Sequence, residues 1–164
     1  SINSSDSNLP FKIMSSNIKR VLLQVCIDHI EKRIKTIESQ LTLIEESRNN
    51  ETKSSAGDKY ETGRAMMQME EDKARAQLME AGAVQSRLSG IDPDEKHAQA
   101  GIGSLVMTNN GAYFIAAGIG KVNIKGDLYY CISIESPIGA LLRGRKSGDS
   151  VEFRTKKITI KDVN

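Results

Sequence analysis

Two acidic residues three positions apart, Asp58 and Glu61, are the side chains of this sequence best suited to chemistry. They lie in a polar segment, residues 50–64, that is longer than a tight turn between two helices requires. One interpretation is structural, because the spacing fits a capping box in which Asp58 caps the following helix and Glu61 reaches back to the Asp58 amide. The other is that both carboxylates coordinate a divalent metal ion shared with another macromolecule. Two carboxylates alone hold Mg²⁺ weakly, so the partner would have to complete the site.

The residues before this acidic segment have the spacing of a coiled-coil helix. Apolar side chains recur at alternating intervals of four and three residues, at Leu23, Ile27, Ile30, Ile34, Ile37, Leu41 and Ile44. Such a helix must bury a narrow apolar stripe against one partner. A second segment offers the matching stripe, at Met67, Ala74, Leu78, Ala81 and Leu88. The pattern predicts an antiparallel helical hairpin within residues 14–98, with its acidic tip at residues 50–64.

The predicted hairpin is long. Residues 17–49 alone would form an arm of roughly 50 Å at 1.5 Å per residue. An arm of this length is expected to reach into a partner, although helices that dimerise or complete a bundle would show the same heptads. Residues 1–13 contain nothing that resembles an ordered element, and we expect a disordered tail or a remnant of cloning there.

The C-terminal part of the chain has a different pattern. Asp92-Pro93-Asp94 closes the second helix, because proline disfavours the helical conformation in the residue before it. Short β-type runs follow at residues 104–107, 112–117, 127–132, 150–154 and 157–160. Residues 136–144 read as a short helix with a serine cap and an early proline. We therefore expect an α+β protein: an N-terminal antiparallel coiled-coil hairpin, then a small antiparallel sheet domain over residues 99–164 with one short helix.

Length, charge and hydropathy limit the classes of function. The 164 residues leave room for one domain or two small units and not for a large multidomain enzyme. The net charge is only +2 and aromatic residues are 4%, so sequence-specific DNA binding is not expected. No apolar run approaches the roughly 18–20 residues of a membrane span, and a soluble cytoplasmic protein without membrane association is expected. Cys26 and Cys131, far apart in sequence and both in apolar patterns, are expected to be buried, reduced thiols.

Two motifs resemble the Gre family of bacterial transcript-cleavage factors, in a compact variant. Gly57-Asp58-Lys59-Tyr60-Glu61 is similar to the family's tip, in which Gly-Asp is followed three positions on by Glu, and the two acidic positions match. The family's C-terminal signature is matched without a gap by Ser136-Pro137-Ile138-Gly139, Ala140-Leu141-Leu142, Gly144 and Gly148-Asp149-x-Val151. The likeness covers residues 17–163. Thr62-Gly63-Arg64-Ala65 stand where the family commonly has Asn-Ala-Glu-Tyr, and an aromatic residue, Tyr60, precedes the Glu.

This resemblance implies a fold and a function. The C-terminal domain would be FKBP-like and would dock at the rim of the secondary channel of bacterial RNA polymerase, while the hairpin passes down the channel. Asp58 and Glu61 would help to hold the second Mg²⁺, shared with polymerase, and to orient the water that cleaves backtracked RNA. The chain would then activate the cleavage activity of polymerase and would not be a stand-alone enzyme.

Further residues are candidates for contacts with these partners. Tyr60 and Arg64, beside the acidic pair, could stack on the RNA 3′ end or neutralise it. The candidate polymerase-binding residues are Ser136, Pro137, Ile138, Gly139, Leu141, Arg143 and Arg145. The last two belong to a basic cluster in a half of the chain, residues 98–164, whose net charge of about +4 suits an acidic partner surface.

Two other functions fit the same elements. A regulator of the same shape could bind the channel without promoting cleavage, although a plug has no need of paired carboxylates. An FKBP-type prolyl isomerase with a dimerising arm would need an apolar pocket rich in aromatic side chains. The aromatic residues of the C-terminal domain, most of them in strand-core patterns, are Tyr113, Phe114, Tyr129, Tyr130 and Phe153.

Overall fold

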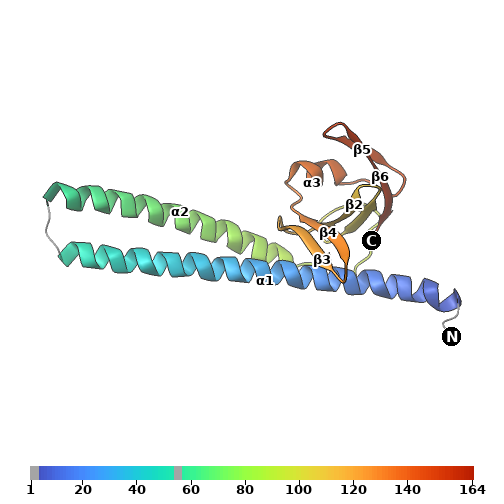
Figure 1. Cartoon of the computed structure of the whole chain (residues 1–164), viewed down its shortest axis with the longest axis horizontal. Coiled ribbons are helices and arrows are strands. Elements are labelled where there is room, and N and C mark those ends of the chain that lie inside the picture. Colours follow the sequence, from blue (N-terminus) through green and yellow to red (C-terminus); the bar gives the residue numbers. More distant parts are fainter. Residues whose placement is uncertain (1–3, 54–56) are drawn as a thin grey trace. The chain divides into compact units, whose positions relative to one another are not determined.

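The computed structural model describes the backbone of residues 4–53 and 57–164, and the side chains of residues 17–50 and 62–164. Its helices are α1 (Ser4–Lys53), α2 (Gly57–Ser89) and α3 (Pro137–Leu142) (Figure 1). Its strands are β1 (Leu105–Thr108), β2 (Gly111–Ile115), β3 (Gly120–Ile124), β4 (Asp127–Ile132), β5 (Ser150–Phe153) and β6 (Lys156–Val163). None of the helices in the described residues combines the length and the apolarity that a membrane span requires.

The chain folds into two compact units. One, which we call the hairpin unit, is Asp28–Ser86; the other, the sheet unit, combines Ser1–Ile27 with Arg87–Asn164. The sequence predicts a boundary between residues 98 and 99, so the structural units divide the chain elsewhere. The difference arises because the first part of α1 packs with the sheet, as described below.

The hairpin unit confirms the antiparallel pair of helices. Its core contains Ile37 and Leu41 from α1 together with Ala74 and Ala81 from α2, and Ile34 and Leu78 pack beside them. Large side chains on α1 thus face small ones on α2, which lets the two helices approach closely over the heptad stripe. From residue 28 to residue 53 this unit is about 39 Å long at 1.5 Å per residue, shorter than the predicted 50 Å.

The connection between the two helices differs from the prediction. Helix α1 continues to Lys53 and α2 begins at Gly57, so most of residues 50–64 is helical and not an extended tip. The segment contains residues with good helix propensity, namely Glu51, Lys53, Lys59, Glu61 and Arg64, and the cost of one interior glycine, Gly63, is only about 1 kcal/mol. Helix α1 also begins at Ser4, within the residues for which a tail is expected. Propagation past an existing turn adds a hydrogen bond for every residue fixed, which favours such extensions.

The sheet unit contains six strands in the order β3-β4-β2-β1-β6-β5. Four neighbouring pairs are antiparallel, while β2 and β4 are parallel, so the prediction of an antiparallel sheet is wrong for that pair. Strand β4 lies between β2 and β3 in the sheet. It pairs in the parallel direction with β2 and in the antiparallel direction with β3. The sequence pattern also misses β3, an edge strand that buries none of its residues fully and therefore lacks a clear apolar alternation.

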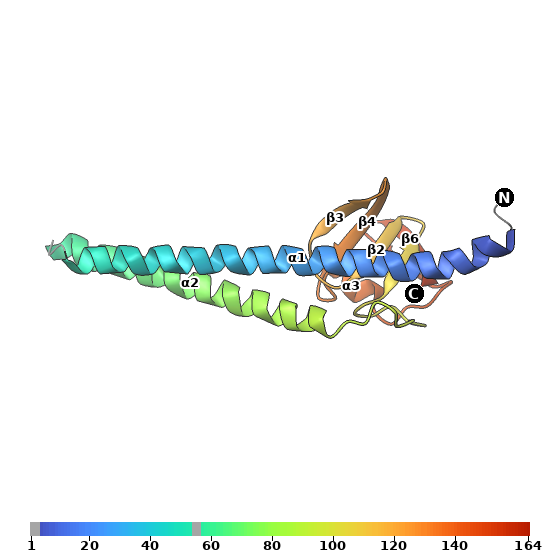
Figure 2. The same ribbon diagram turned by 90° about the horizontal axis from the view of Figure 1, so that it is seen from below.

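Both faces of the sheet are covered. On one face Val106, Tyr113 and Ile158 form a core with Ile138 and Leu142 of the short helix α3. On the other face lies the first part of α1, which crosses the sheet in both views (Figures 1 and 2). Alternation along the strands directs buried residues to both sides, as expected for a sheet between two layers.

The first part of α1 is fixed to the sheet unit by burial and by polar contacts. Leu22 and Cys26 are fully buried. Lys19 is buried as well, and its Nζ donates to the backbone carbonyl oxygens of Glu95 at 2.7 Å and Asn164 at 3.1 Å. Desolvation lowers the pKa of Lys19, against the opposing field of nearby carboxylates. This stretch of α1 is therefore a structural part of the sheet unit and not of a free arm.

Candidate functional site

The acidic pair lies at the start of α2. Asp58 and Glu61 fall within its first two turns, near the residues that connect the two helices of the hairpin; their side chains, and that of Tyr60, lie outside the described residues. Helical positions three residues apart share one face of a helix. Two carboxylates on one face supply the oxygen ligands that Mg²⁺ prefers, so the donor set fits this ion. The capping interpretation stays a prediction beside the metal-binding one, because it depends on the side chains of Asp58 and Glu61, which lie outside the described residues.

An ion-pair network joins the two helices two to four turns further along α2 than the acidic pair. Glu71 of α2 is 7% exposed and accepts hydrogen bonds from Arg48 of α1 and from Nε and Nη2 of Arg75 at 3.0 and 2.9 Å. Arg75 also lies 3.9 Å from Glu45 of α1, and Arg48 donates to Gln68 at 3.3 Å. The guanidinium groups of Arg75 and Arg48 lower the pKa of Glu71. The network fixes the register of α1 against α2 in the distal part of the hairpin.

We expect Glu71→Gln to destabilise the hairpin in a pH-dependent manner. The folded pKa of Glu71 is lower than its value in the unfolded chain, about 4.3, so the ionised group stabilises the hairpin above that pH. The contribution is lost as the pH falls through the lowered folded pKa. Thermal melts followed by circular dichroism should show a lower midpoint for Glu71→Gln at neutral pH and convergence with the wild type in acid. Glu70→Gln, which changes an exposed neighbour, is the matched control and should shift the midpoint little at either pH.

Exposed apolar side chains on the hairpin are candidates that the sequence pattern misses. Met66 is 60% exposed and Met69 72%, and Leu43 on α1 is 61% exposed. These three residues lie outside the heptad stripe, at positions where the pattern predicts polar side chains. An apolar residue at such a position is the signal in the sequence that could have identified them. Flexible methionine side chains suit contacts with an irregular partner surface. Arg64, a candidate for contact with RNA, is also exposed.

The signature residues of the C-terminal half build the short helix α3. The Ser136 hydroxyl accepts from the Gly139 amide at 3.1 Å and donates to the Ser133 carbonyl at 2.6 Å, and Pro137 occupies the first turn. Ile138 and Gly139 are buried against the sheet. Each of these residue types is thus explained by capping, by helix initiation or by packing. Their assignment as partner contacts stays a prediction, and Pro137 is the most exposed of the four.

Replacing Gly139 should strongly destabilise the sheet unit. A Cβ at this position would lie far inside contact distance of the Ser133 carbonyl oxygen and 3.0 Å from Cα of Ile134, both of them backbone atoms that cannot rotate away. We expect Gly139→Ala to lower the free energy of unfolding by about 3 kcal/mol. Gly82→Ala in α2 is the opposite control, because its Cβ meets nothing within 4 Å and it should stabilise the helix by about 0.5–1 kcal/mol. Urea denaturation of both variants measures the difference.

The remaining predicted docking residues follow α3. Arg143 and Arg145 are exposed, as is Lys146, while Leu141 is half-buried. The Arg145 Nε donates to the Leu141 carbonyl at 3.3 Å, which orients the guanidinium of this exposed side chain. The structure therefore presents a compact basic cluster on the surface of the sheet unit.

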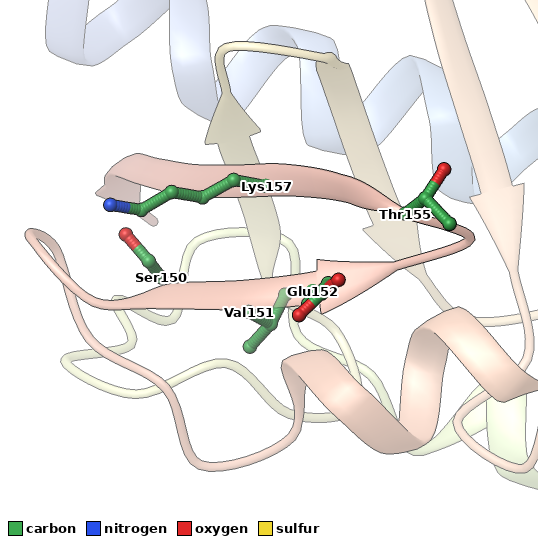
Figure 3. Close-up of a pocket in the computed structure, with 5 residues that line it drawn as sticks. All are labelled: Ser150, Val151, Glu152, Thr155 and Lys157. Carbon is green, nitrogen blue, oxygen red and sulfur yellow. The ribbon is translucent and has the colours of Figure 1, made fainter.

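An open pocket of about 430 Å³ lies beside the β5–β6 hairpin. It is lined by Ser150, Val151, Glu152, Thr155 and Lys157 (Figure 3). No aromatic side chain contributes to this lining. Phe114 is fully buried and Tyr113, nearly so, stacks on Tyr130 with ring centroids 5.3 Å apart. These aromatic side chains stabilise the sheet unit from within.

Comparisons with known proteins give little beyond this geometry. No family model matches the sequence, and no curated protein matches it. Among solved structures, one titled "Structure of the transcription factor Gfh1" is similar over 84% of this chain and 92% of its own, with 15% identity and a TM-score of 0.36. A TM-score this low carries no argument about fold or function, so the functional case depends on the residues and the architecture described above.

Proposed function

We propose that this chain is a transcription elongation factor of the Gre kind. It binds bacterial RNA polymerase through the sheet unit, inserts the hairpin unit into the secondary channel, and stimulates hydrolysis of RNA that protrudes when polymerase has backtracked. The chain has no hydrolytic activity of its own in this proposal, because it only completes a site that polymerase provides.

The observation that carries the proposal is the place of the acidic pair in the hairpin. Helix α1 ends at Lys53 and α2 begins at Gly57, so Asp58 and Glu61 belong to the first two turns beside the connection between two long helices. A hairpin of about 39 Å can present these residues deep inside a narrow channel. The Glu71 network behind them holds the two helices in one register, which limits movement of the acidic end.

Each part of the chain has a separate role in this mechanism. Asp58 and Glu61 would hold the second Mg²⁺, shared with polymerase, through their carboxylate oxygens, and they would accept hydrogen bonds from the attacking water and so orient it. When bound, the ion would supply Lewis-acid activation of that water. Arg64 and Tyr60 hold the extruded RNA 3′ end by charge and by stacking. Arg143 and Arg145 attach the sheet unit to an acidic surface of polymerase and thereby set how far the hairpin reaches.

A chain without its hairpin tests the docking role of the sheet unit. Replacing Asp28–Ser86 by a short glycine–serine linker retains the first part of α1, which the sheet needs for its covered face. We expect this variant to bind polymerase and to compete with the full chain without stimulating RNA cleavage. When Arg143→Ala and Arg145→Ala are added to the linker variant, its competition with the full chain should weaken about tenfold or more, because two positive charges of the proposed docking surface are lost. When Lys156→Ala and Lys157→Ala are added instead, two positive charges are lost at another place, and competition should change little.

The controls keep folding and docking apart. Circular dichroism must show a cooperative melt for the linker variant before its binding is judged. A folded linker variant that fails to compete would contradict docking by the sheet unit. Equal weakening by both charge-removing pairs would instead show that only the net positive charge matters.

A further inference from the structure

Two cysteines from distant parts of the sequence meet inside the sheet unit. Cys26 lies on α1 and Cys131 on β4, and the two thiols interact with each other. Both are free thiols, and their exposed fractions are 0% and 1%. Neither the proposed docking nor the proposed cleavage uses them. A disulfide needs the two sulfur atoms to approach to about 2.05 Å, so only side chains that already neighbour each other, as these two do, can form one without a large movement of the backbone.

The surroundings of the pair favour one sulfur as the more reactive. Hydrogen bonds from the Cys131 thiol and from the Ala117 amide lower the pKa of Cys26. The same thiol contact and burial raise the pKa of Cys131. Ala117 belongs to the connection between β2 and β3, and the next residue, Gly118, is exposed. In the proposal below, a small oxidant reaches Cys26 when this short connection opens locally, which does not require unfolding of the sheet.

We propose that Cys26 and Cys131 are a modification site, which a hydroperoxide converts into an intramolecular disulfide that ties α1 to β4. The thiolate of Cys26 attacks one oxygen of the peroxide, the O–O bond breaks, and a sulfenic acid and one molecule of water form from hydrogen peroxide. The sulfur of Cys131 then attacks the sulfenic sulfur, the S–S bond forms, and the S–O bond breaks with loss of a second water. Two thiols are oxidised and one peroxide is reduced to two waters.

The disulfide would change how firmly α1 is held. In the reduced protein the first part of α1 is attached to the sheet only by packing and by polar contacts such as those of Lys19. A covalent bond between Cys26 and Cys131 closes a loop of about 100 residues that includes the whole hairpin unit. A cross-link of this length is expected to raise the melting temperature by roughly 10 °C. The site would make the attachment of α1 to the sheet dependent on oxidation.

The test uses the full chain and hydrogen peroxide. After treatment, removal of peroxide and denaturation, titration with a thiol reagent should fall from two thiols per chain to none, and the intact mass should fall by two hydrogen atoms. Trypsin should release peptides Val21–Lys32 and Gly126–Arg143 as one cross-linked species. The melting temperature should rise by roughly 10 °C, and dithiothreitol should reverse every change.

Three results would overturn the proposal. Both thiols could remain titratable at peroxide concentrations that oxidise free cysteine; both could gain oxygen without a cross-link; or the disulfides could join two chains, which a non-reducing gel would reveal. Cys131→Ser serves as the control variant, because it should retain the Cys26 thiol or gain one oxygen there but never form the cross-linked peptide. If this variant folds poorly, the presence or absence of the cross-linked peptide in the oxidised wild-type chain still supports or contradicts the proposal.

Discussion

A chain carrying Asp58→Asn and Glu61→Gln is expected to bind polymerase normally and to lose stimulated RNA cleavage. Each change removes the charge of a metal ligand with almost no change in volume. Misplacement of a reacting group by about 1 Å costs on the order of 100-fold in rate, and loss of both ligands should cost at least as much. Each single variant should also lose most of the stimulation, because neither carboxylate holds the ion alone. The measurement is the rate of RNA shortening in a backtracked complex at saturating variant.

The same variants separate the chemical role of the pair from a structural one. If Asp58 and Glu61 only stabilised the start of α2, their replacement would lower stability by about 0.5–2 kcal/mol and leave cleavage intact. Thermal melts measured beside the cleavage rates distinguish the two cases. Glu80→Gln, which neutralises an exposed acidic residue in the middle of α2, is the matched control and should leave both quantities unchanged.

Shortening the hairpin by one heptad should abolish cleavage although both acidic residues remain. The contacts of Arg48 with Glu71, and of Glu45 with Arg75, show which residues of the two helices face each other. By that register, Lys35–Leu41 faces Leu78–Val84, and deleting both segments keeps the heptad stripes in phase. The tip then withdraws by roughly 10 Å, far more than the roughly 2 Å between a carboxylate oxygen and Mg²⁺. The cleavage assay and a polymerase-binding assay together measure the effect.

A substitution of equal extent provides the control for this deletion. Exchanging the exposed residues of the same two segments for alanine leaves the length unchanged and should retain cleavage. If the shortened chain binds polymerase and still stimulates cleavage at the full rate, reach is irrelevant and the carboxylates do not act at the active centre of polymerase.

The hairpin could be predicted from sequence because its information is local and periodic. Ile37 and Leu41 fall on the four-and-three spacing and are buried, as are Ala74 and Ala81 of the opposing stripe. The connection was harder to predict, because glycine and polar residues near 57 read as a loop while α2 begins at Gly57. A single glycine costs too little to end a helix that has a partner to pack on.

The features that could not be predicted depend on contacts distant in sequence. Strand β3 forms because β4 offers it hydrogen bonds, and its exposed residues carry no periodic pattern. Burial and the reduced state of Cys26 and Cys131 agree with the prediction, whereas their contact requires α1 to lie on β4. Local spacing cannot give such a pairing, since the two residues belong to elements that meet only in the folded chain.

The candidate site divides in the same way. The acidic pair and the basic residues Arg143 and Arg145 are found by residue type and spacing, because charge at a turn or a helix end is visible in the sequence. The Glu71 network cannot be found in this way, because a carboxylate on a helix is usually exposed to solvent. Glu71 contacts the other helix only because Arg48 of α1 faces it in the folded hairpin. Supporting residues of this kind emerge only once the register of the two helices is known.

RNA cleavage in a stalled, backtracked bacterial elongation complex, measured with and without the wild-type chain in the presence of Mg²⁺, is the most direct experiment. RNA labelled at its 5′ end should shorten faster by at least tenfold when the chain is added, and the shortened RNA should resume elongation when nucleotides are supplied. Binding of the chain to the same complex must be measured in parallel. A chain that is bound but leaves the rate of RNA shortening unchanged would contradict the proposed function.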